Sequence, residues 1–182
     1  RIKIYRRSVA EPKRKQWLRP ETEISELMRL LSWALRFEVN ELNKNNVRLM
    51  ASGRLAALPS FVQKQLTRSM ESLKGNTGLI LNLALDYGAR AEIVDAVNSC
   101  LNRQMTKITE EDISAQMYTA SLPDPDLLIR TSGEMRLSNF MLWQLAYTEL
   151  YITPVYWPDF RKDHLLEAIT EFQKRERRFG GI

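Results

Sequence analysis

The sequence holds only one cysteine and one histidine, Cys100 and His164, among its 182 residues. A single cysteine cannot form a disulfide within the chain, and the cysteine–histidine spacing typical of zinc sites is absent. No apolar run approaches the roughly 18–20 residues needed to span a bilayer, and the N-terminus has no apolar segment behind its charges, unlike a secretory signal. We therefore expect a globular protein of a reducing, cytoplasmic compartment, with peripheral membrane contact or an organellar location left open.

An excess of basic residues is also missing from most of the chain, although the net charge is +5. The first 20 residues hold eight basic residues and one acidic residue, so the rest of the chain holds 19 basic and 21 acidic residues. A nucleic-acid-binding domain normally carries a basic patch on its folded surface. We therefore expect no nucleic-acid partner. A basic module that binds nucleic acid or another anion through the N-terminal segment remains the weaker alternative.

Helical and extended patterns alternate along the chain. Apolar residues recur at spacings of three and four in the segments 21–44, 59–74, 93–101 and 163–173, which predicts helices. Short apolar runs typical of strands cover 47–51, 79–85, 126–129 and 150–152. The alternation predicts an α/β fold with a central, mostly parallel sheet flanked by helices. No repeat or linker suggests a second domain.

Three local predictions can be made from the same pattern. Thr109–Asp112 resembles a capping box at the start of a short helix. The segment 139–147 is expected to be helical, with Asn139 as its cap. The helix that follows the strand 79–85 is expected to bury its larger apolar residues, which are Ile93, Val94, Val97 and Leu101.

Two arginines follow the strand 126–129, where a parallel sheet places its ligands. Arg130 and Arg136 present planar forks of donors that match phosphate oxygens, and Ser138 adds a hydroxyl. Gly133 permits close approach of the backbone, and the amides of this loop can point at an anion. The segment therefore predicts a diphosphate clamp. In the alternative interpretation the arginines pair at the surface with neighbouring carboxylates, those of Asp126 and Glu134.

Residues 126–151, DLLIRTSGEMRLSNFMLWQLAYTELY, closely resemble the signature of the cis-prenyltransferases, the family of undecaprenyl and dehydrodolichyl diphosphate synthases. Other segments agree with this family in order and spacing. They are 17–20, 75–90, 157–160 and 175–181. The resemblance covers residues 17–182, which we interpret as one partial domain of this kind, and leaves 1–16 as an atypical basic N-terminal segment.

This resemblance implies a Mg²⁺-dependent enzyme that condenses isopentenyl diphosphate with an allylic diphosphate to give a Z-polyprenyl diphosphate. It implies a homodimer, or a heterodimer, whose C-terminal tail reaches the neighbouring active site. The implied substrate-binding residues are Arg130, Arg136, Ser138, Trp17, Arg19, Asn82, Arg178 and Gly180. Glu149 is implied as a Mg²⁺ ligand, and the alternative for this carboxylate is an ion pair with a nearby arginine.

The family's N-terminal element, Asp-Gly-Asn-x-Arg-Trp, has no match in these 182 residues. In the family that element supplies the catalytic aspartate and binds the allylic diphosphate. We therefore expect the first strand and helix of the fold to be missing and leave the catalytic residue unassigned. We expect the chain to bind isopentenyl diphosphate without extending a prenyl chain unaided. A non-catalytic or partner-dependent subunit is the alternative.

Overall fold

The computed structural model describes residues 21–175, with side chains from Glu23 onward. The chain divides into two compact units, the first running to Ser121 and the second beginning at Leu122. The described range holds six α-helices and four short strands. None of the described helices is both long enough and apolar enough to cross a membrane.

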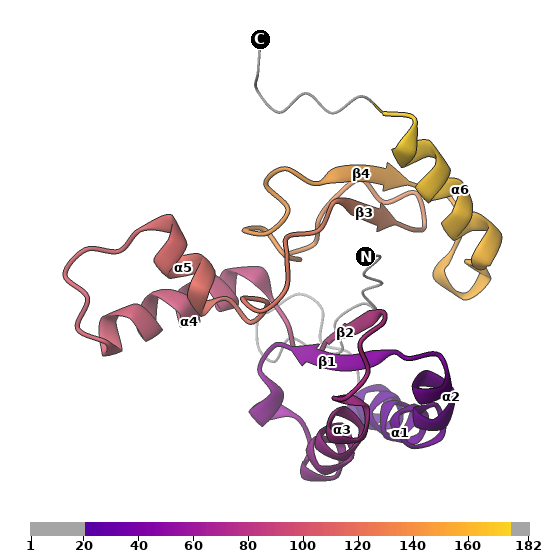
Figure 1. The fold of residues 1–182 in the computed structure, drawn as a ribbon, viewed down its shortest axis with the longest axis horizontal. Helices are drawn as coiled ribbons and strands as arrows, with labels where there is room; N and C mark the ends of the chain where they lie inside the picture. The colour runs from indigo at the N-terminus through magenta and orange to yellow at the C-terminus, as the bar shows by residue number, and fades with distance from the viewer. Residues whose placement is uncertain (1–20, 176–182) are drawn as a thin grey trace. The chain divides into compact units, whose positions relative to one another are not determined.

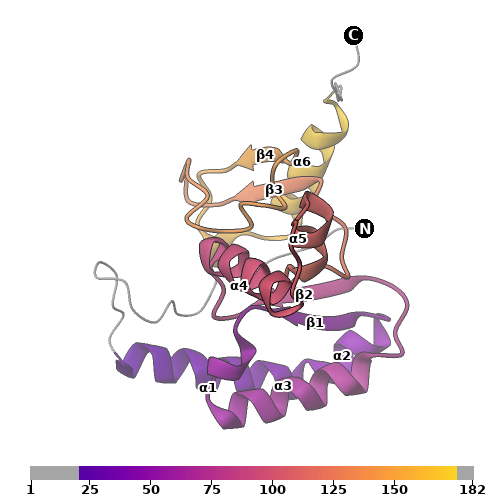
Figure 2. The ribbon, with the colours of Figure 1, turned by 90° about the vertical axis from the view of Figure 1, so that its left-hand side faces the viewer.

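The first unit is a parallel strand pair covered by helices. Its elements are α1 (Glu21–Phe37), α2 (Val39–Lys44), β1 (Arg48–Ser52), a 3-10 turn (Leu55–Ala57), α3 (Ser60–Leu73), β2 (Ile80–Ala84), α4 (Ala89–Asn102) and α5 (Glu110–Gln116). β1 and β2 run parallel, with Arg48 opposite Ile80 and Ser52 opposite Ala84. Figures 1 and 2 show α1 and α3 on one side of this pair and α4 and α5 on the other.

The core of the first unit lies between the strand pair and the helices α1 and α3. Side chains of α1 and α3 at the predicted spacings of three and four are buried there, which confirms that part of the prediction. The buried members of this core are Met28, Leu35, Leu49, Leu58, Val62, Leu66, Leu73 and Leu85.

The predicted inward face of α4 is partly wrong. Val94 and Leu101 are exposed, at 56% and 55% of their surface, whereas Ile93 and Val97 are half-buried. The buried residues of this helix are instead Ala89, Glu92, Ala96 and Cys100. A charged residue can face inward here because Glu92 accepts hydrogen bonds from the backbone nitrogen of Tyr118 (2.9 Å) and from the hydroxyl of Tyr87.

The capping box at the start of α5 is confirmed. The Thr109 hydroxyl accepts a hydrogen bond from the backbone nitrogen of Asp112 (3.3 Å), and the Asp112 carboxylate accepts one from the backbone nitrogen of Thr109 (2.9 Å). Two amide donors at the helix start are thereby satisfied.

The second unit is built on another parallel pair. Its elements are β3 (Leu127–Arg130), β4 (Glu149–Ile152), a 3-10 turn (Trp157–Asp159) and α6 (Lys162–Gln173). Leu127 lies opposite Glu149 and Arg130 opposite Ile152, and α6 packs against β4. The predicted α/β class with parallel strand pairing is therefore confirmed.

The predicted helix over 139–147 is wrong, because this segment forms a series of turns. Ser138, Asn139 and Met141 have φ angles of 52°, 58° and 46°, in the left-handed region that a right-handed helix cannot include. One helical-type hydrogen bond remains, from the nitrogen of Leu145 to the carbonyl of Met141 (2.9 Å). Asn139 therefore has no helix to cap.

Candidate functional site

Arg130 is the last residue of β3, and its backbone is fixed by the parallel ladder. The backbone nitrogen of Thr153 donates to the carbonyl of Arg130 (2.9 Å), and at the other end of the pair the nitrogen of Glu149 donates to the carbonyl of Asp126 (3.1 Å). These bonds fix the backbone of Arg130 at the carboxyl end of β3, which is where the sequence predicted a ligand site.

The loop after β3 is tied to the segment after β4. The nitrogens of Ser132 and Gly133 donate to the carbonyls of Val155 and Thr153, each at 2.9 Å. The prediction that this loop aims its amides at an anion is therefore wrong for these two residues, because both amides already have partners. Gly133 has a φ of 64°, and an added Cβ there would meet nothing nearer than the Cα of Pro154 at 4.0 Å. A glycine suits this position through its backbone conformation rather than through close contact.

The side chains of Arg130 and Arg136 converge on the carboxylate of Glu134. The Nη2 atom of Arg130 lies 3.6 Å from Oε2 of Glu134, and the Nη2 atom of Arg136 contacts the same oxygen. These are ion contacts rather than well-aligned hydrogen bonds. Oε2 of Glu134 and Nε of Arg130 are both buried, and neither makes a hydrogen bond to any residue in the described part of the chain. The alternative of pairing with Glu134 is thus observed, but it leaves the hydrogen-bonding capacity of the arginines underused.

An open pocket adjoins these three charged side chains. The rest of its lining is apolar and comes from both strands and the loop between them. The apolar lining residues are Leu128, Met135, Leu137, Leu150 and Ile152. A pocket with two guanidinium groups and an apolar wall suits a small molecule that combines an anionic head with a short hydrocarbon tail.

Glu149, the predicted metal ligand, is paired with an arginine. Nη1 of Arg175 donates to Oε2 of Glu149 (2.7 Å) and to the carbonyl of Leu150 (3.0 Å). Among the residues with described positions, no group of three or more histidine, cysteine or acidic side chains lies close enough to hold a metal ion. Glu149 alone still fits Mg²⁺, because this ion commonly binds one or two carboxylates together with substrate phosphates and water.

Two of the remaining predicted site residues, Ser138 and Asn82, lie in the described part of the chain. Ser138 is exposed. Asn82 lies in the first unit, is 1% exposed and donates to the hydroxyl of Ser52 (2.9 Å). The others lie outside the described residues, and the roles of all of these side chains stay predictions. They are Trp17, Arg19, Arg178 and Gly180.

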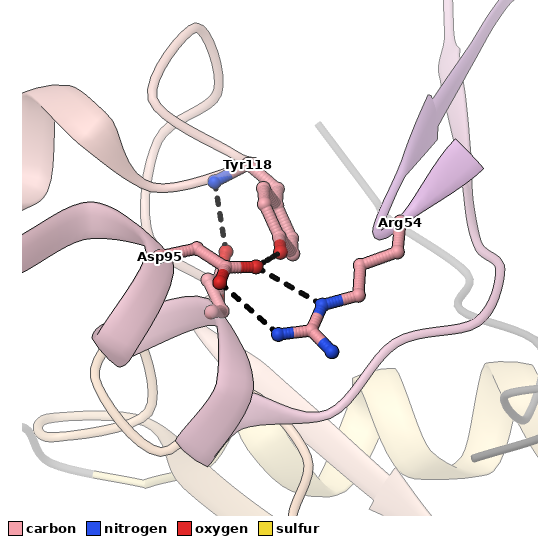
Figure 3. Close-up of polar contacts among 4 residues, drawn as sticks. Arg54, Asp95 and Tyr118 are labelled. Carbon is pink, nitrogen blue, oxygen red and sulfur yellow. Dashed lines mark hydrogen bonds and ion pairs between the residues drawn. The ribbon is translucent and has the colours of Figure 1, made fainter. Parts of the chain in front are cut away.

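A second arginine–carboxylate cluster lies in the first unit, and no pattern in the sequence predicted it (Figure 3). Arg54 directs its Nε and Nη2 atoms at the two oxygens of Asp95, both at 3.0 Å. The hydroxyl of Tyr118 donates to the same carboxylate. These residues are 41 and 23 positions apart, so no motif or helical spacing could have joined them.

The contacts in this cluster shift the pKa values of its members. The hydrogen bond to Asp95 raises the pKa of the Arg54 guanidinium above its ordinary value. Burial alone would raise the pKa of Asp95, but the hydrogen bonds from Arg54 and Tyr118 outweigh it and hold that pKa below its usual range. Burial and the bond to Asp95 raise the pKa of the Tyr118 hydroxyl to about 12. The cluster therefore keeps all three groups in the protonation states that favour its bonds.

Comparison with known proteins gives a consistent set of matches. A family model described as putative undecaprenyl diphosphate synthase matches residues 14–180. An isoprenyl transferase of Bacillus cereus is 51% identical over 172 residues, which cover 91% of this chain and 67% of the relative. An isoprenyl transferase of Fusobacterium nucleatum is 49% identical over 166 residues and is covered to 72%.

Two solved structures are similar throughout. Lavandulyl diphosphate synthase from Lavandula x intermedia, in complex with dimethylallyl diphosphate, matches with a TM-score of 0.88 and 33% identity, over 98% of this chain and 78% of that one. A probable undecaprenyl diphosphate synthase from Campylobacter jejuni matches with a TM-score of 0.83 and 34% identity, over 98% of this chain and 82% of the other.

Proposed function

Because this chain belongs to the undecaprenyl diphosphate synthase family of prenyltransferase enzymes, we propose that its pocket in the second unit binds isopentenyl diphosphate as the prenyl acceptor. The single observation that carries this proposal is the convergence of Arg130 and Arg136 beside an apolar wall. In the reaction we propose, the acceptor is condensed with an allylic diphosphate to lengthen a Z-polyprenyl diphosphate.

The two arginines would hold the diphosphate of the acceptor. Arg130 is fixed by the strand ladder and has a buried Nε donor with no hydrogen-bond partner among the described residues. Arg136 is more exposed, with 68% of its side chain accessible, and can close on a ligand from the solvent side. Charge-assisted hydrogen bonds of this kind contribute roughly 1.5–3 kcal/mol each.

The apolar wall would hold the five-carbon tail. Leu128 of β3 and Leu150 and Ile152 of β4 line the pocket together with the arginines. Leu150 and Ile152 are 48% and 38% exposed, so covering them with a hydrocarbon tail removes apolar surface from water. Burying a methylene group contributes about 0.8 kcal/mol, so the hydrocarbon tail adds to the binding free energy of isopentenyl diphosphate.

Glu149 would help to hold Mg²⁺ on a diphosphate, after its ion pair with Arg175 opens. When bound, the cation would neutralise diphosphate charge and so favour departure of the leaving group. In the condensation, the double bond of isopentenyl diphosphate attacks the allylic carbon, the allylic diphosphate leaves, and a proton is lost from the acceptor. We propose that this chain's own residues hold the diphosphate and the hydrocarbon tail of isopentenyl diphosphate. They thereby fix the orientation of its double bond.

We also propose that the chain acts as a homodimer. Large apolar side chains of the second unit are exposed in the single chain, among them Tyr147 at 94% and Tyr156 at 66%. Such side chains are commonly covered in an interface. Sedimentation or light scattering would show a dimer at micromolar concentration, and a strictly monomeric chain would contradict this part of the proposal.

The proposal is tested by measuring binding and chain extension on the same preparation. The chain is incubated with Mg²⁺ and labelled isopentenyl diphosphate, with and without farnesyl diphosphate. We expect these 182 residues to bind isopentenyl diphosphate and not to extend farnesyl diphosphate unaided. Efficient extension would overturn the second expectation, whereas binding without extension even beside an active relative would favour the non-catalytic subunit.

Arg68→Ala is the matched control for substitutions of Arg130 and Arg136. It removes one positive charge at an exposed position of α3. That variant should bind isopentenyl diphosphate as the wild-type chain does. If the wild-type chain binds no diphosphate at all, the proposed function is wrong.

A further inference from the structure

The carboxylate of Glu134 occupies the space between the two arginines that we assign to the diphosphate. Its Oε2 atom is within 3.6 Å of Arg130 and in contact with Arg136, and it is buried without a hydrogen bond from any described side chain or backbone group. A carboxylate placed only to fix the guanidinium groups would be expected to accept aligned, bidentate bonds, as Asp95 does from Arg54.

We propose that Glu134 is an internal counter-anion of this site, which an entering diphosphate displaces. The inference rests on the proposed function, because it assumes that the pocket binds a diphosphate. With Glu134 in place, the group of three charged side chains has a net charge of +1; without its charge, the net charge would be +2.

This arrangement makes Glu134 a competitor of every anion that enters the pocket. A monoanion or a single phosphate gains little by replacing a carboxylate that is already in place. A diphosphate brings more charge and more acceptor oxygens, and it can use the buried Nε donor of Arg130 that Glu134 leaves without a hydrogen bond. Glu134 therefore weakens the binding of all anions, but it leaves the diphosphate as the ligand best able to compete.

The test compares Glu134→Gln with the wild-type chain in calorimetric titrations with inorganic diphosphate and inorganic phosphate, without divalent cations. Glutamine keeps the shape of the side chain and removes its charge. We expect diphosphate to bind roughly three- to tenfold more tightly to the variant at low ionic strength, which is the scale of the Coulomb energy of two unit charges at contact distance in bulk water, because the pocket is open to solvent. The gain should be smaller for phosphate, which carries less charge, and smaller at high salt.

Glu171→Gln is the matched control, because Glu171 lies in the same unit and pairs with Lys174 at 2.8 Å on the exposed face of α6. It makes the same change in net charge away from the pocket, and it should leave diphosphate affinity unchanged. Unchanged or weaker binding by Glu134→Gln would overturn the inference, and so would an equal gain in the control.

Two further variants separate the possible failures. If Arg130→Ala weakens diphosphate binding and Glu134→Gln gives no gain, the counter-anion inference is wrong and the proposed function stands. If Arg130→Ala has no effect, the proposed function itself is wrong.

Glu134→Asp keeps the charge but draws it back by one methylene, so we expect a gain smaller than that of Glu134→Gln. A gain as large as that of Glu134→Gln would mean that charge is not the cause, and it would overturn the inference.

Discussion

The two arginine–carboxylate clusters of this protein differ in how completely their hydrogen-bonding groups are used. In the first unit, Arg54 donates two aligned hydrogen bonds of 3.0 Å to Asp95. The hydroxyl of Tyr118 donates another to the same carboxylate (Figure 3). In the second unit, Arg130 and Arg136 share one carboxylate oxygen of Glu134, and a buried donor of Arg130 has no hydrogen-bond partner among the described residues. The chemical groups are the same, but the geometries are opposite.

The difference separates a structural role from a binding role. A fully bonded cluster has little left to offer a ligand, and it joins the segment after β1 to α4 and to the residues after α5. A cluster with an unused donor beside an apolar pocket carries a cost that binding can remove. Substitutions in the first cluster should therefore lower stability and leave affinity unchanged, whereas substitutions in the second should change affinity and leave stability unchanged.

The largest effect is expected from Glu92→Ala. Glu92 is fully buried and accepts hydrogen bonds from the backbone nitrogen of Tyr118, a member of the first cluster, and from the hydroxyl of Tyr87. Its loss leaves the N–H of Tyr118 without its acceptor and opens a cavity, so the free energy of unfolding should fall by roughly 2–4 kcal/mol. Urea denaturation followed by circular dichroism measures this. A fall below about 0.5 kcal/mol, the level of an ordinary surface change, would contradict the structural role.

Tyr118→Phe should lower the free energy of unfolding by about 1–1.5 kcal/mol near neutral pH, since it removes one hydrogen bond to a carboxylate. The folded protein raises the pKa of this hydroxyl to about 12, so it favours the protonated form. The stabilisation is then fully present below about pH 10, the ordinary tyrosine pKa, and is lost as the pH rises through the folded value. The stability difference between wild type and variant should shrink over that range. A difference that stays constant would show that the hydroxyl is not bonded as described.

Arg136→Lys replaces a planar fork with a single ammonium group and keeps the charge. We expect isopentenyl diphosphate to bind more weakly by about 1 kcal/mol, the scale of one net hydrogen bond, with no change in unfolding free energy. Fluorescence or calorimetric titration measures the affinity. Full retention of affinity would mean that only the charge of Arg136 matters.

The smallest effect is expected from Asp95→Asn, because the side chains of Arg54 and Asp95 are 47% and 36% exposed. Solvent weakens such a pair, so the loss of stability should be roughly 0.5–1 kcal/mol at pH 7. The folded protein lowers the pKa of Asp95, so its contribution is present above the ordinary aspartate pKa near 4 and is lost as the pH falls through the folded value. Stability curves of the two proteins should therefore converge in acid. A difference that persists at pH 2 would contradict the ion pair as its source.

Much of the fold could be predicted from the sequence, because strands and amphipathic helices have local patterns. The run 79–85 predicted β2, and Thr109–Asp112 predicted the start of α5. The helix predicted over 139–147 is wrong because the left-handed residues Asn139 and Met141 interrupt the segment, and such φ values leave little trace in apolar spacing. The predicted inward face of α4 is partly wrong because the helix buries Glu92 on the side where apolar residues were expected.

The candidate site could be predicted in part for a similar reason. Arg130 and Arg136 follow a strand within one short segment, so their convergence has a local signal. The pairing of Glu149 with Arg175 joins β4 to the end of α6, and the Arg54–Asp95–Tyr118 cluster joins three distant segments. Contacts of this kind depend on the packing of whole elements, and no rule of spacing reports them.

The most direct test of the central claim is one paired measurement on Arg130→Ala and Arg54→Ala. For each variant, the affinity for isopentenyl diphosphate and the free energy of unfolding are determined under the same conditions. We predict that Arg130→Ala loses roughly 1.5–3 kcal/mol of binding free energy and keeps its stability, as expected for one charged hydrogen bond to a ligand. Arg54→Ala should lose stability and keep its affinity. If Arg130→Ala binds isopentenyl diphosphate as tightly as the wild-type chain does, the arginine pair of the second unit is not the diphosphate site.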